Sequence, residues 1–414
     1  MGNFIILSDN PVRTNEKDLW GLGDAAEELQ QLIAAAEDPP LTIGVFGGWG
    51  SGKTSLLSLL KVALDDAGVV RTAWFDAWRY RERQEVWPAL LQCVLAELSD
   101  QARESALKGR LSDFGRAAAR TFFGRGAQVV SHGLVSANDM DNILNRYAEL
   151  QARRTSEISG FADRFDELTG EALAGARLVI LVDDLDRCEP DAALEILEGI
   201  KLFLGSRHCI FVIALDINAL SESLRTRYPD SEEYRVNYLE RHIQLVRYIP
   251  EPPEDRMRRG LASLCRRELN DSIWNLVRTA AEGNPRRAKR FINMLLLAGD
   301  WSSDDLGQIL TVGRLMVFRV QFPEFFVALA RDPALWRDLE AYRADDVSVD
   351  EHRADYLRRL LEDHRLAAFL RRTGPEARGY YPRAPGPETL PGLLERAWRY
   401  GPGGSLENPG RRSS

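Results

Sequence analysis

Cysteine and histidine are scarce in this sequence, and neither is grouped. The 414 residues include four cysteines and five histidines, and no two cysteines form a C-x-x-C pair. Zinc modules and disulfide frameworks both need such residues at short, regular spacings. The scattered pattern therefore argues against both and predicts a reduced, cytoplasmic protein.

Long apolar runs are also missing. The longest stretch without Asp, Glu, Lys or Arg is Pro39 to Gly52, with 14 residues, whereas a membrane-spanning helix needs about 20 apolar residues. The first residues, MGNFIILSDNPVRT, hold only a four-residue apolar run with no basic segment before it. This pattern is not typical of a signal peptide. We expect no membrane span.

Basic residues are in the minority. The sequence has 54 Lys and Arg against 62 Asp and Glu, a net charge of −8. A protein covered by a basic nucleic-acid-binding surface would show the opposite balance. Nucleic acid is therefore not an indicated partner, although a local basic patch is compatible with the total.

One stretch carries a specific chemical pattern: Leu41 to Leu60, LTIGVFGGWGSGKTSLLSLL. It predicts a short strand, a glycine-rich turn and a helix, the order that a phosphate-binding P-loop needs. Glycines let successive backbone N–H groups point at a phosphate, and the helix N-terminus adds partial positive charge. Lys53 would reach the β- and γ-phosphates, and the Thr54 hydroxyl would hold Mg²⁺. The predicted nucleotide-binding residues are Gly47, Gly48, Trp49, Gly50, Ser51, Gly52, Lys53, Thr54 and Ser55.

Two acids follow a second apolar strand. Leu178 to Val182 predicts a buried parallel strand, with Asp183 and Asp184 at its carboxyl end. In P-loop enzymes such an acid holds Mg²⁺ through its water shell, so Asp183 is the predicted metal ligand together with Thr54. Asp184 would orient or deprotonate the attacking water.

Two more apolar segments end in polar residues. Val69 to Phe75 predicts a strand followed by the DAWRY segment, which either borders the site or only packs. His208 to Leu215 predicts another strand, ending at Asp216, which either senses the γ-phosphate or caps the next helix. Strands that alternate with helices indicate βαβ units and a parallel sheet, whose ligands bind at the carboxyl ends of the strands.

A basic helix follows the predicted core. Asn284 can cap a helix that starts at Pro285, which puts Arg286 and Arg287 near the positive end of the helix dipole. Phosphates of a nucleotide would offset this electrostatic cost. A salt-bridged helix or one that faces RNA is the alternative.

Composition divides the chain into successive regions. A charged insertion interrupts the core and includes four arginines: Arg110, Arg116, Arg120 and Arg125. A basic helix face of this kind could contact nucleic acid or acidic lipid, although a solvated face is more usual. The proline-rich EPPEDRM segment marks a boundary. The predicted regions are a lead-in helix (1–40), the P-loop core (41–250) with its helical insertion (about 100–172), a helical lid (251–300), a helical extension (301–373) and a Pro/Gly-rich tail (374–414).

Taken together, the motifs resemble the KAP family of P-loop NTPases. They are GVFGGWGSGKTS, WFDAWRY, LVILVDDLDRCEP followed by LEILEGIKLFL, FVIALD, NYLERHIQ and GNPRRAKRFIN, in the family's order over roughly residues 15–300. The resemblance implies an α/β fold with an additional-strand P-loop NTPase sheet flanked by helices, a helical lid, and ATP with Mg²⁺ as the bound nucleotide. It also implies sensor-like roles for Asp216 and for Arg286 or Arg287. The predicted catalytic residues are Lys53, Asp184, Asp216, Arg286 and Arg287.

The sequence departs from the family pattern in two ways. Many KAP proteins carry membrane-spanning helices between the P-loop and the acidic strand, whereas the corresponding insertion here is too charged to span a bilayer. The aromatic strand motif often has Asn where this chain has Asp76.

The predicted function is a Mg²⁺-dependent ATPase that acts as a nucleotide-driven switch. The resemblance adds a bacterial defence or signalling system as its setting, with a protein partner or a second copy of the chain. A nucleic-acid-dependent motor or loader and a nucleotide-binding scaffold without turnover are the alternatives. The acidic net charge argues against the motor, and the intact set of Lys53, Thr54, Asp183 and Asp184 argues against the scaffold.

Overall fold

The chain, described by a computed structural model, divides into two compact units. The residues described are 5–14, 18–37, 39–80, 83–123, 155–203, 206–227, 238–266, 268–298, 306–343, 351–374 and 381–400. The sheet unit is Pro11–Pro250, and the helical unit combines Met1–Asn10 with Glu251–Ser414.

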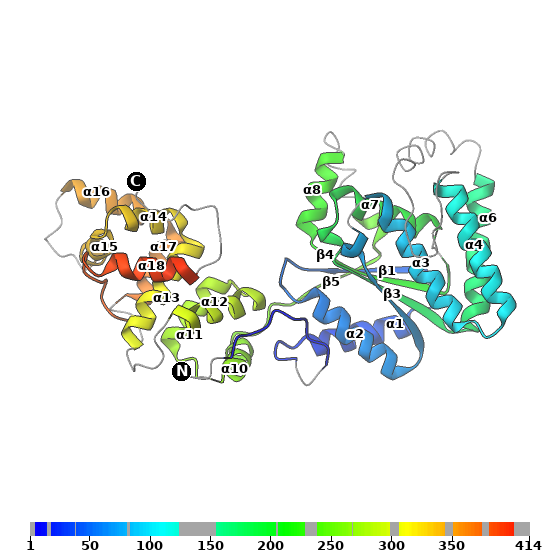
Figure 1. Ribbon diagram of the computed structural model, residues 1–414, viewed down its shortest axis with the longest axis horizontal. Helices are drawn as coiled ribbons and strands as arrows, with labels where there is room; N and C mark the ends of the chain where they lie inside the picture. Colours follow the sequence, from blue (N-terminus) through cyan, green and yellow to red (C-terminus); the bar gives the residue numbers. More distant parts are fainter. Residues whose placement is uncertain are drawn as a thin grey trace. The chain divides into compact units, whose positions relative to one another are not determined.

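Five parallel strands form the centre of the sheet unit (Figure 1). They are β1 (Leu41–Phe46), β2 (Val70–Asp76), β3 (Arg177–Asp183), β4 (Cys209–Leu215) and β5 (Leu245–Tyr248), in the order β2-β3-β4-β1-β5. The strand β4 lies between β1 and β3 and pairs in parallel with both. This is the additional strand of the predicted sheet, so the predicted fold is confirmed.

Helices cover both faces of this sheet. They are α1 (Leu22–Ala35), α2 (Lys53–Ala67), α3 (Arg83–Gln101), α4 (Ser105–Phe123), α6 (Thr155–Leu173), α7 (Pro190–Phe203) and α8 (Ile217–Arg227). Figure 1 shows α1 and α2 on one face, with α3, α7 and α8 on the other. Because both faces are covered, β4 and nearly all of β3 are buried, which explains their continuous apolar sequences.

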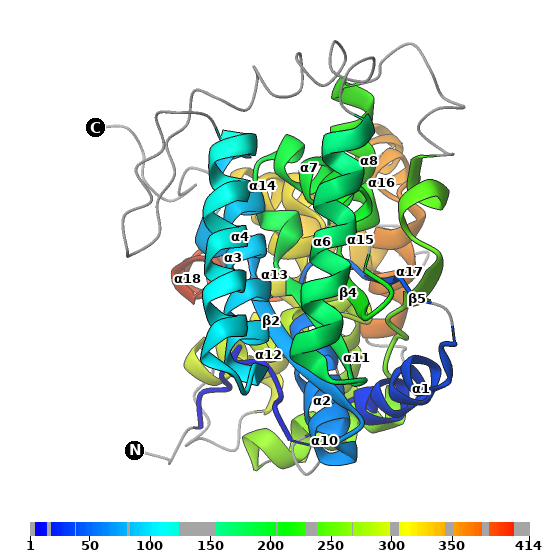
Figure 2. The ribbon, with the colours of Figure 1, turned by 90° about the vertical axis from the view of Figure 1, so that its right-hand side faces the viewer.

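The helical insertion packs into the sheet unit through aromatic side chains. Phe114 of α4 lies with its ring 4.4 Å from that of Phe161 on α6, and the two helices run side by side (Figure 2). Arg110 pairs with Glu167 and Glu171, and Arg116 with Asp113. The Arg120 side chain and Arg125 lie outside the described residues. The two described arginines thus have acidic partners within the insertion.

The helical unit is built around one buried helix, α13. Its helices are α10 (Glu254–Cys265), α11 (Asp271–Ala281), α12 (Pro285–Ala298), α13 (Leu306–Gln321), α14 (Pro323–Arg331), α15 (Leu335–Arg343), α16 (Glu351–Leu360), α17 (His364–Thr373) and α18 (Leu390–Tyr400). Two arginines on α13 are buried among them. Arg314 pairs with Glu340 at 2.7 Å, donates to the Pro382 carbonyl at 2.9 Å and lies 4.3 Å from the Trp336 ring centre.

The C-terminal stretch contributes a helix to this unit. Within the Pro/Gly-rich tail that the sequence predicts from Gly374 onward, α18 packs against α13. Arg319 donates to the backbone carbonyls of Ala397 and Trp398 at 3.0 and 2.6 Å. Carbonyl acceptors and buried apolar residues of α18 therefore complete the core of the helical unit.

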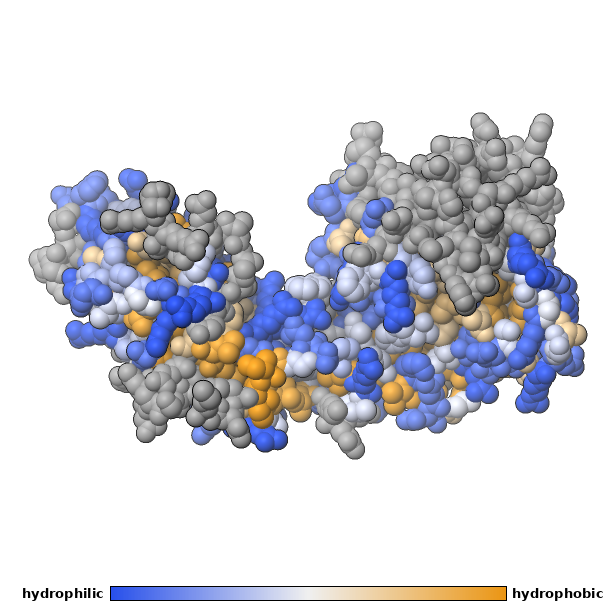
Figure 3. Space-filling view, viewed as in Figure 1, coloured by the Kyte–Doolittle hydropathy of each residue, from blue (hydrophilic) through white to orange (hydrophobic). Residues whose placement is uncertain are grey.

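Figure 3 shows a mostly hydrophilic face, interrupted by an apolar patch on the helical unit. Ile6 and Leu297 are the large apolar side chains most exposed among the described residues of this unit. In the part of the chain that the structure describes, no helix is both long and apolar enough to cross a membrane.

Replacing Arg314 with alanine is expected to destabilise the helical unit by about 3–5 kcal/mol, because Glu340 would stay buried without its cation. Scanning calorimetry of the full chain measures the loss. Arg358→Ala is the matched control, since Arg358 pairs with Asp355 on the surface, where ion pairs contribute little. Equal losses in the two variants would contradict the role assigned to Arg314.

Candidate nucleotide-binding site

The loop between β1 and α2 has a backbone that only glycine accommodates at several positions. Gly50 and Gly52 have φ values of 82° and 112°, in the region that disfavours other residues. A Cβ added at Gly47 would lie 2.5 Å from the Ser51 hydroxyl oxygen, and one at Gly52 would lie 2.9 Å from Leu22. The glycine pattern is therefore a geometric requirement of this turn.

The same loop offers unsatisfied donors to an anion. The α2 N-cap is Gly52, which supplies no side-chain hydrogen bond to the first amides of this 15-residue helix. The Ser51 hydroxyl is buried and has no hydrogen-bond partner among the described residues. Free amides at a helix N-terminus, with a hydroxyl beside them, fit the phosphates of a nucleotide.

Lys53, the first residue of α2, is buried beside this loop. Its ammonium group donates to the carbonyl oxygens of Gly47 at 2.9 Å and Gly48 at 3.4 Å. It also forms an ion pair with Asp186 at 2.8 Å, and the two side chains are only 8% and 7% exposed. A buried pair of this kind needs both of its members, because either charge alone would be strongly unfavourable.

The acidic strand brings the two predicted metal-binding residues together. The Thr54 hydroxyl donates to Asp183 Oδ1 at 3.3 Å, although the two residues lie on different elements, α2 and β3. Asp183 is 3% exposed. Burial raises the pKa of Asp183 to about 6, and the neighbouring charge of Asp184 adds to the increase.

Hydroxyl and carboxylate oxygens of this kind fit Mg²⁺. Among the described residues, no group of three or more His, Cys, Asp or Glu side chains could hold a metal ion alone. Mg²⁺ usually keeps several water ligands and takes only one or two from the protein, with the rest from substrate phosphates. Thr54 and Asp183 would therefore hold a Mg²⁺ that arrives with a nucleotide.

Asp184 lies just after the strand in an uncommon backbone conformation. Its φ is 55°, in the left-handed region that aspartate tolerates better than most residues. It opens a short 3₁₀ helix, η4 (Leu185–Arg187), and pairs with Arg187 at 2.9 Å. Burial raises the pKa of Asp184, while the charge of Arg187 opposes the increase. Such strain is typical of positions that hold a functional group in place.

The DAWRY segment lies against these acids. Asp76 ends β2 and is the register partner of Asp183 on β3, and the next residues form η2 (Ala77–Tyr80). Arg79 pairs with Asp76 at 3.1 Å, while the other Asp76 oxygen is buried without a hydrogen-bond partner among the described residues. The Trp78 ring lies 5.3 Å from the Arg187 guanidinium. The segment thus borders the acidic cluster.

Two of the predicted residues have other contacts, and a third is exposed. Ser55 accepts a hydrogen bond from the Val12 amide at 3.0 Å, and Trp49 is 57% exposed. Asp216 directly follows β4 and accepts from the Asn218 amide at 2.9 Å. This is the capping interaction that the sequence offered as an alternative, and a sensor role for Asp216 stays a prediction.

Arg286 and Arg287 belong to the helical unit. Asn284 caps α12 as predicted, since its side-chain oxygen accepts from the backbone amides of both arginines at 3.0 and 3.1 Å. The Arg287 side chain pairs with Glu282 at 2.8 Å, and that of Arg286 lies 4.0 Å from Asp9. Carboxylates of the same unit thus supply the negative charge that offsets these arginines near the helix N-terminus. The sensor roles of Arg286 and Arg287 stay predictions.

Asp186 is the residue of this site that the sequence motifs did not identify. It lies three residues after Asp183, in the 3₁₀ turn η4. The helical turn returns its side chain toward the strand end, where it meets Lys53. The third acid of the D-D-L-D segment is the signal that could have pointed to it.

Comparison with known proteins gives one family. The profile described as "KAP family P-loop domain" matches residues 24–300. A search of curated proteins gave no match. Among solved structures, Cdc6p from Pyrobaculum aerophilum is similar at 14% identity and a TM-score of 0.44, with 95% of this chain and 99% of that chain covered. The Walker-type ATPase PABY2304 of Pyrococcus abyssi is similar at 14% identity and a TM-score of 0.38, with 93% and 98% covered.

Asp183→Asn is expected to stabilise the metal-free protein at pH 8. The folded protein binds a proton at Asp183 up to a pH of about 6, so its stability falls as the pH rises from about 4 through 6 and stays lower above that. The increase in the pKa of Asp183 from its ordinary value of 3.8 to about 6 corresponds to a loss of at most about 3 kcal/mol in the free energy of unfolding at pH 8.

Thermal melting in a chelating buffer measures this effect. The melting temperature of Asp183→Asn should exceed that of the wild type at pH 8, and the difference should shrink toward pH 4.5. Asp163→Asn, which changes an exposed aspartate on α6, is the control and should show no pH-dependent gain. A difference that is the same at both pH values would argue against a buried carboxylate as its cause.

Proposed function

Because the chain belongs to the KAP family of P-loop NTPases, we propose that it hydrolyses ATP with Mg²⁺ and that the bound nucleotide switches the protein between two states. The observation that carries the proposal is the meeting of the P-loop with the acidic strand. Lys53 and Thr54 of α2 contact Asp186 and Asp183 at the carboxyl end of β3. The residues proposed to bind the phosphates, to hold the metal ion and to orient the water molecule therefore lie at one edge of the sheet.

Each residue has a distinct task in this proposal. The α2 amides and the Ser51 hydroxyl bind phosphate oxygens, and Thr54 and Asp183 hold the metal ion. Bound Mg²⁺ supplies positive charge that stabilises the phosphates in the transition state. Asp184 orients a water molecule and accepts its proton as the water oxygen bonds to the γ-phosphorus and the bond to the β-phosphate oxygen breaks.

Lys53 must change partners during nucleotide binding. Its ammonium group is neutralised by Asp186 and turned toward the carbonyls of its own loop. To contact the β- and γ-phosphates, it must give up at least part of these contacts. Asp186 therefore competes with the phosphates for the lysine.

The switch is proposed to involve the arginines at the start of α12. Arg286 and Arg287 have Asp9 and Glu282 as partners, so a phosphate-sensing role requires these carboxylates to be exchanged. We place the switch in a bacterial defence or signalling system, with a protein partner or a second copy of the chain. The ion pairs of Arg110 and Arg116 give no support to a nucleic-acid motor.

Wild-type protein is expected to hydrolyse ATP in preference to GTP when Mg²⁺ is present. Lys53→Ala and Asp184→Asn should each lower the turnover by at least about 100-fold, since each removes a group that acts on the transition state. Asp184→Asn should keep ATP binding. Steady-state phosphate release measures the rates, with Asp163→Asn as the control.

The same assay tests the alternatives. Turnover that rises with added DNA or RNA and falls steeply with salt would favour the motor. A wild type that binds ATP but never hydrolyses it, with or without nucleic acid, would favour the scaffold.

Asp186→Asn is expected to tighten ATP binding by about tenfold or more, because it removes the competitor of the phosphates for Lys53. The unliganded variant should melt at a lower temperature, since Lys53 would stay buried without a carboxylate, and ATP should raise its melting temperature more than that of the wild type. Calorimetric titration and melting curves measure both effects. If Asp186→Asn weakens ATP binding as Lys53→Ala does, the proposed competition is wrong.

A further inference from the structure

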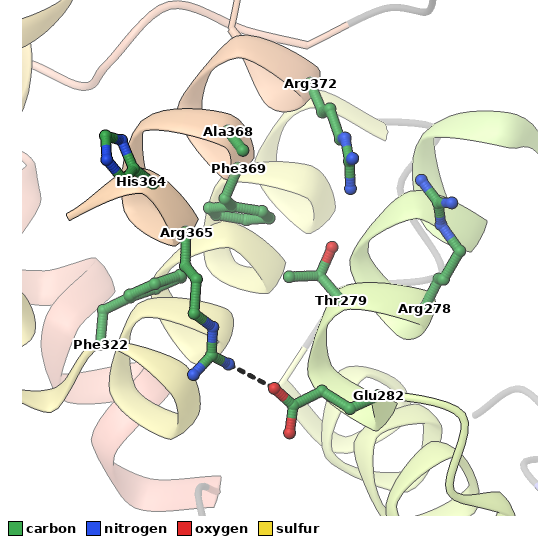
Figure 4. Close-up of a pocket in the computed structure, with 9 residues that line it drawn as sticks. All are labelled: Arg278, Thr279, Glu282, Phe322, His364, Arg365, Ala368, Phe369 and Arg372. Carbon is green, nitrogen blue, oxygen red and sulfur yellow. Dashed lines mark hydrogen bonds and ion pairs between the residues drawn. The ribbon is translucent and has the colours of Figure 1, made fainter. Parts of the chain in front are cut away.

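The helical unit contains a cavity that the proposed ATPase activity does not use. It has a volume of about 380 Å³ and lies between α11 and α17 (Figure 4). Four of its lining residues are basic: Arg278, His364, Arg365 and Arg372. We call it the arginine cavity.

The basic side chains converge on this space. Figure 4 shows the guanidinium groups of Arg278, from α11, and Arg372, from α17, pointing toward one another. Arg372 is exposed and the Arg278 side chain is 39% exposed, so water weakens their repulsion, and an anion between them would be attracted to both. Arg278 has Glu254 at 3.6 Å, and Arg372 has no hydrogen bond or ion pair with any residue that the structure describes.

The carboxylate in the cavity wall, Glu282, already forms ion pairs with two arginines. Among the described residues, Glu282 is the only carboxylate that lines the cavity. One of its oxygens binds Arg365 and the other binds Arg287 at 2.8 Å. Glu282 therefore does not neutralise Arg372, and the acidic partner of Arg278, Glu254, is not part of the cavity wall.

The floor of the cavity is apolar and fixed. Phe322 and Phe369 line it and are themselves buried, with their rings stacked 6.0 Å apart. Phe369 also packs edge-to-face on Phe318 at 5.5 Å, which holds the ring in place. The cavity thus combines a cationic rim with an apolar base.

We infer that the arginine cavity binds a small organic phosphate of nucleotide size, with the phosphate between Arg278 and Arg372 and the organic part over the phenylalanine floor. Planar guanidinium groups donate paired hydrogen bonds to phosphate oxygens. A volume of about 380 Å³ lies within the range of small-molecule sites and exceeds what inorganic phosphate alone would fill.

This site also contacts a residue of the proposed switch. Glu282 binds both Arg365 of the cavity and Arg287 of α12. A ligand in the cavity that displaced Arg365 from Glu282 would alter the ion pairing of Arg287. The cavity is therefore a candidate effector-binding site that is separate from the P-loop.

Binding is measured on the full chain carrying Lys53→Ala, so that the P-loop contributes little and the result does not depend on ATP hydrolysis. Adenosine 5′-monophosphate is the organic probe, inorganic phosphate the small probe and a short single-stranded oligonucleotide the polymer probe. We expect the monophosphate to bind with a dissociation constant of about 1 mM or below in calorimetric titration, and inorganic phosphate to bind more weakly.

Arg372→Gln should weaken binding of the monophosphate by about tenfold or more. Arg371→Gln is the matched control, because Arg371 and Arg372 are both exposed on α17 but only Arg372 lines the cavity. Neither arginine has a partner among the described residues, so both variants should melt like the parent chain. Arg278→Gln should weaken binding in the same way from the opposite wall.

Several results would overturn the inference. One is the absence of monophosphate binding, and another is an equal loss in Arg371→Gln, which would indicate only general charge attraction. Monophosphate binding that survives Arg372→Gln would place the ligand elsewhere. Oligonucleotide binding that depends on Arg372, without binding of the monophosphate, would assign the surface to nucleic acid instead.

Discussion

The parallel register of β1, β4 and β3 is the constraint on which the candidate site depends. Because β4 pairs with both neighbours in the same direction, the carboxyl ends of the three strands meet at one edge of the sheet. Helices cover both faces, and the strands between them are almost wholly apolar. Polar groups are therefore confined to the turns that leave the strands, and the P-loop, Asp183 and Asp216 are neighbours for this reason.

The site gathers features that disfavour folding. Asp183 is buried with a raised pKa, Asp184 has a left-handed backbone conformation, and Lys53 is buried in an ion pair with Asp186. Each has a free-energy cost that the apolar core of the sheet unit offsets. A protein under selection for stability alone would replace these residues, so their joint presence at one edge points to chemistry.

Features encoded by neighbouring residues could be predicted from the sequence, whereas contacts between distant parts of the chain could not. The resemblance to the KAP family implied the additional-strand sheet, and Asn284 before Pro285 predicted the cap of α12. The partner of Lys53 was missed because spacing does not show which acid of a 3₁₀ turn points back to the loop. Arg290 pairs with Asp9 across 281 positions of the chain, and no local pattern encodes such a contact. The arginine cavity likewise joins α11 and α17.

The packing of α18 bears on where the folded chain can be cut. Composition suggests Gly374 as a natural limit, but Arg314 and Arg319 donate to carbonyl oxygens of Pro382, Ala397 and Trp398. Shortened proteins that stop at Gly374 would keep both buried guanidinium groups while losing these acceptors, and would uncover the apolar side of α13 to solvent. Such proteins would be prone to aggregation and proteolysis, so the limit of an expressible fragment lies beyond Tyr400, whatever the proline content before it.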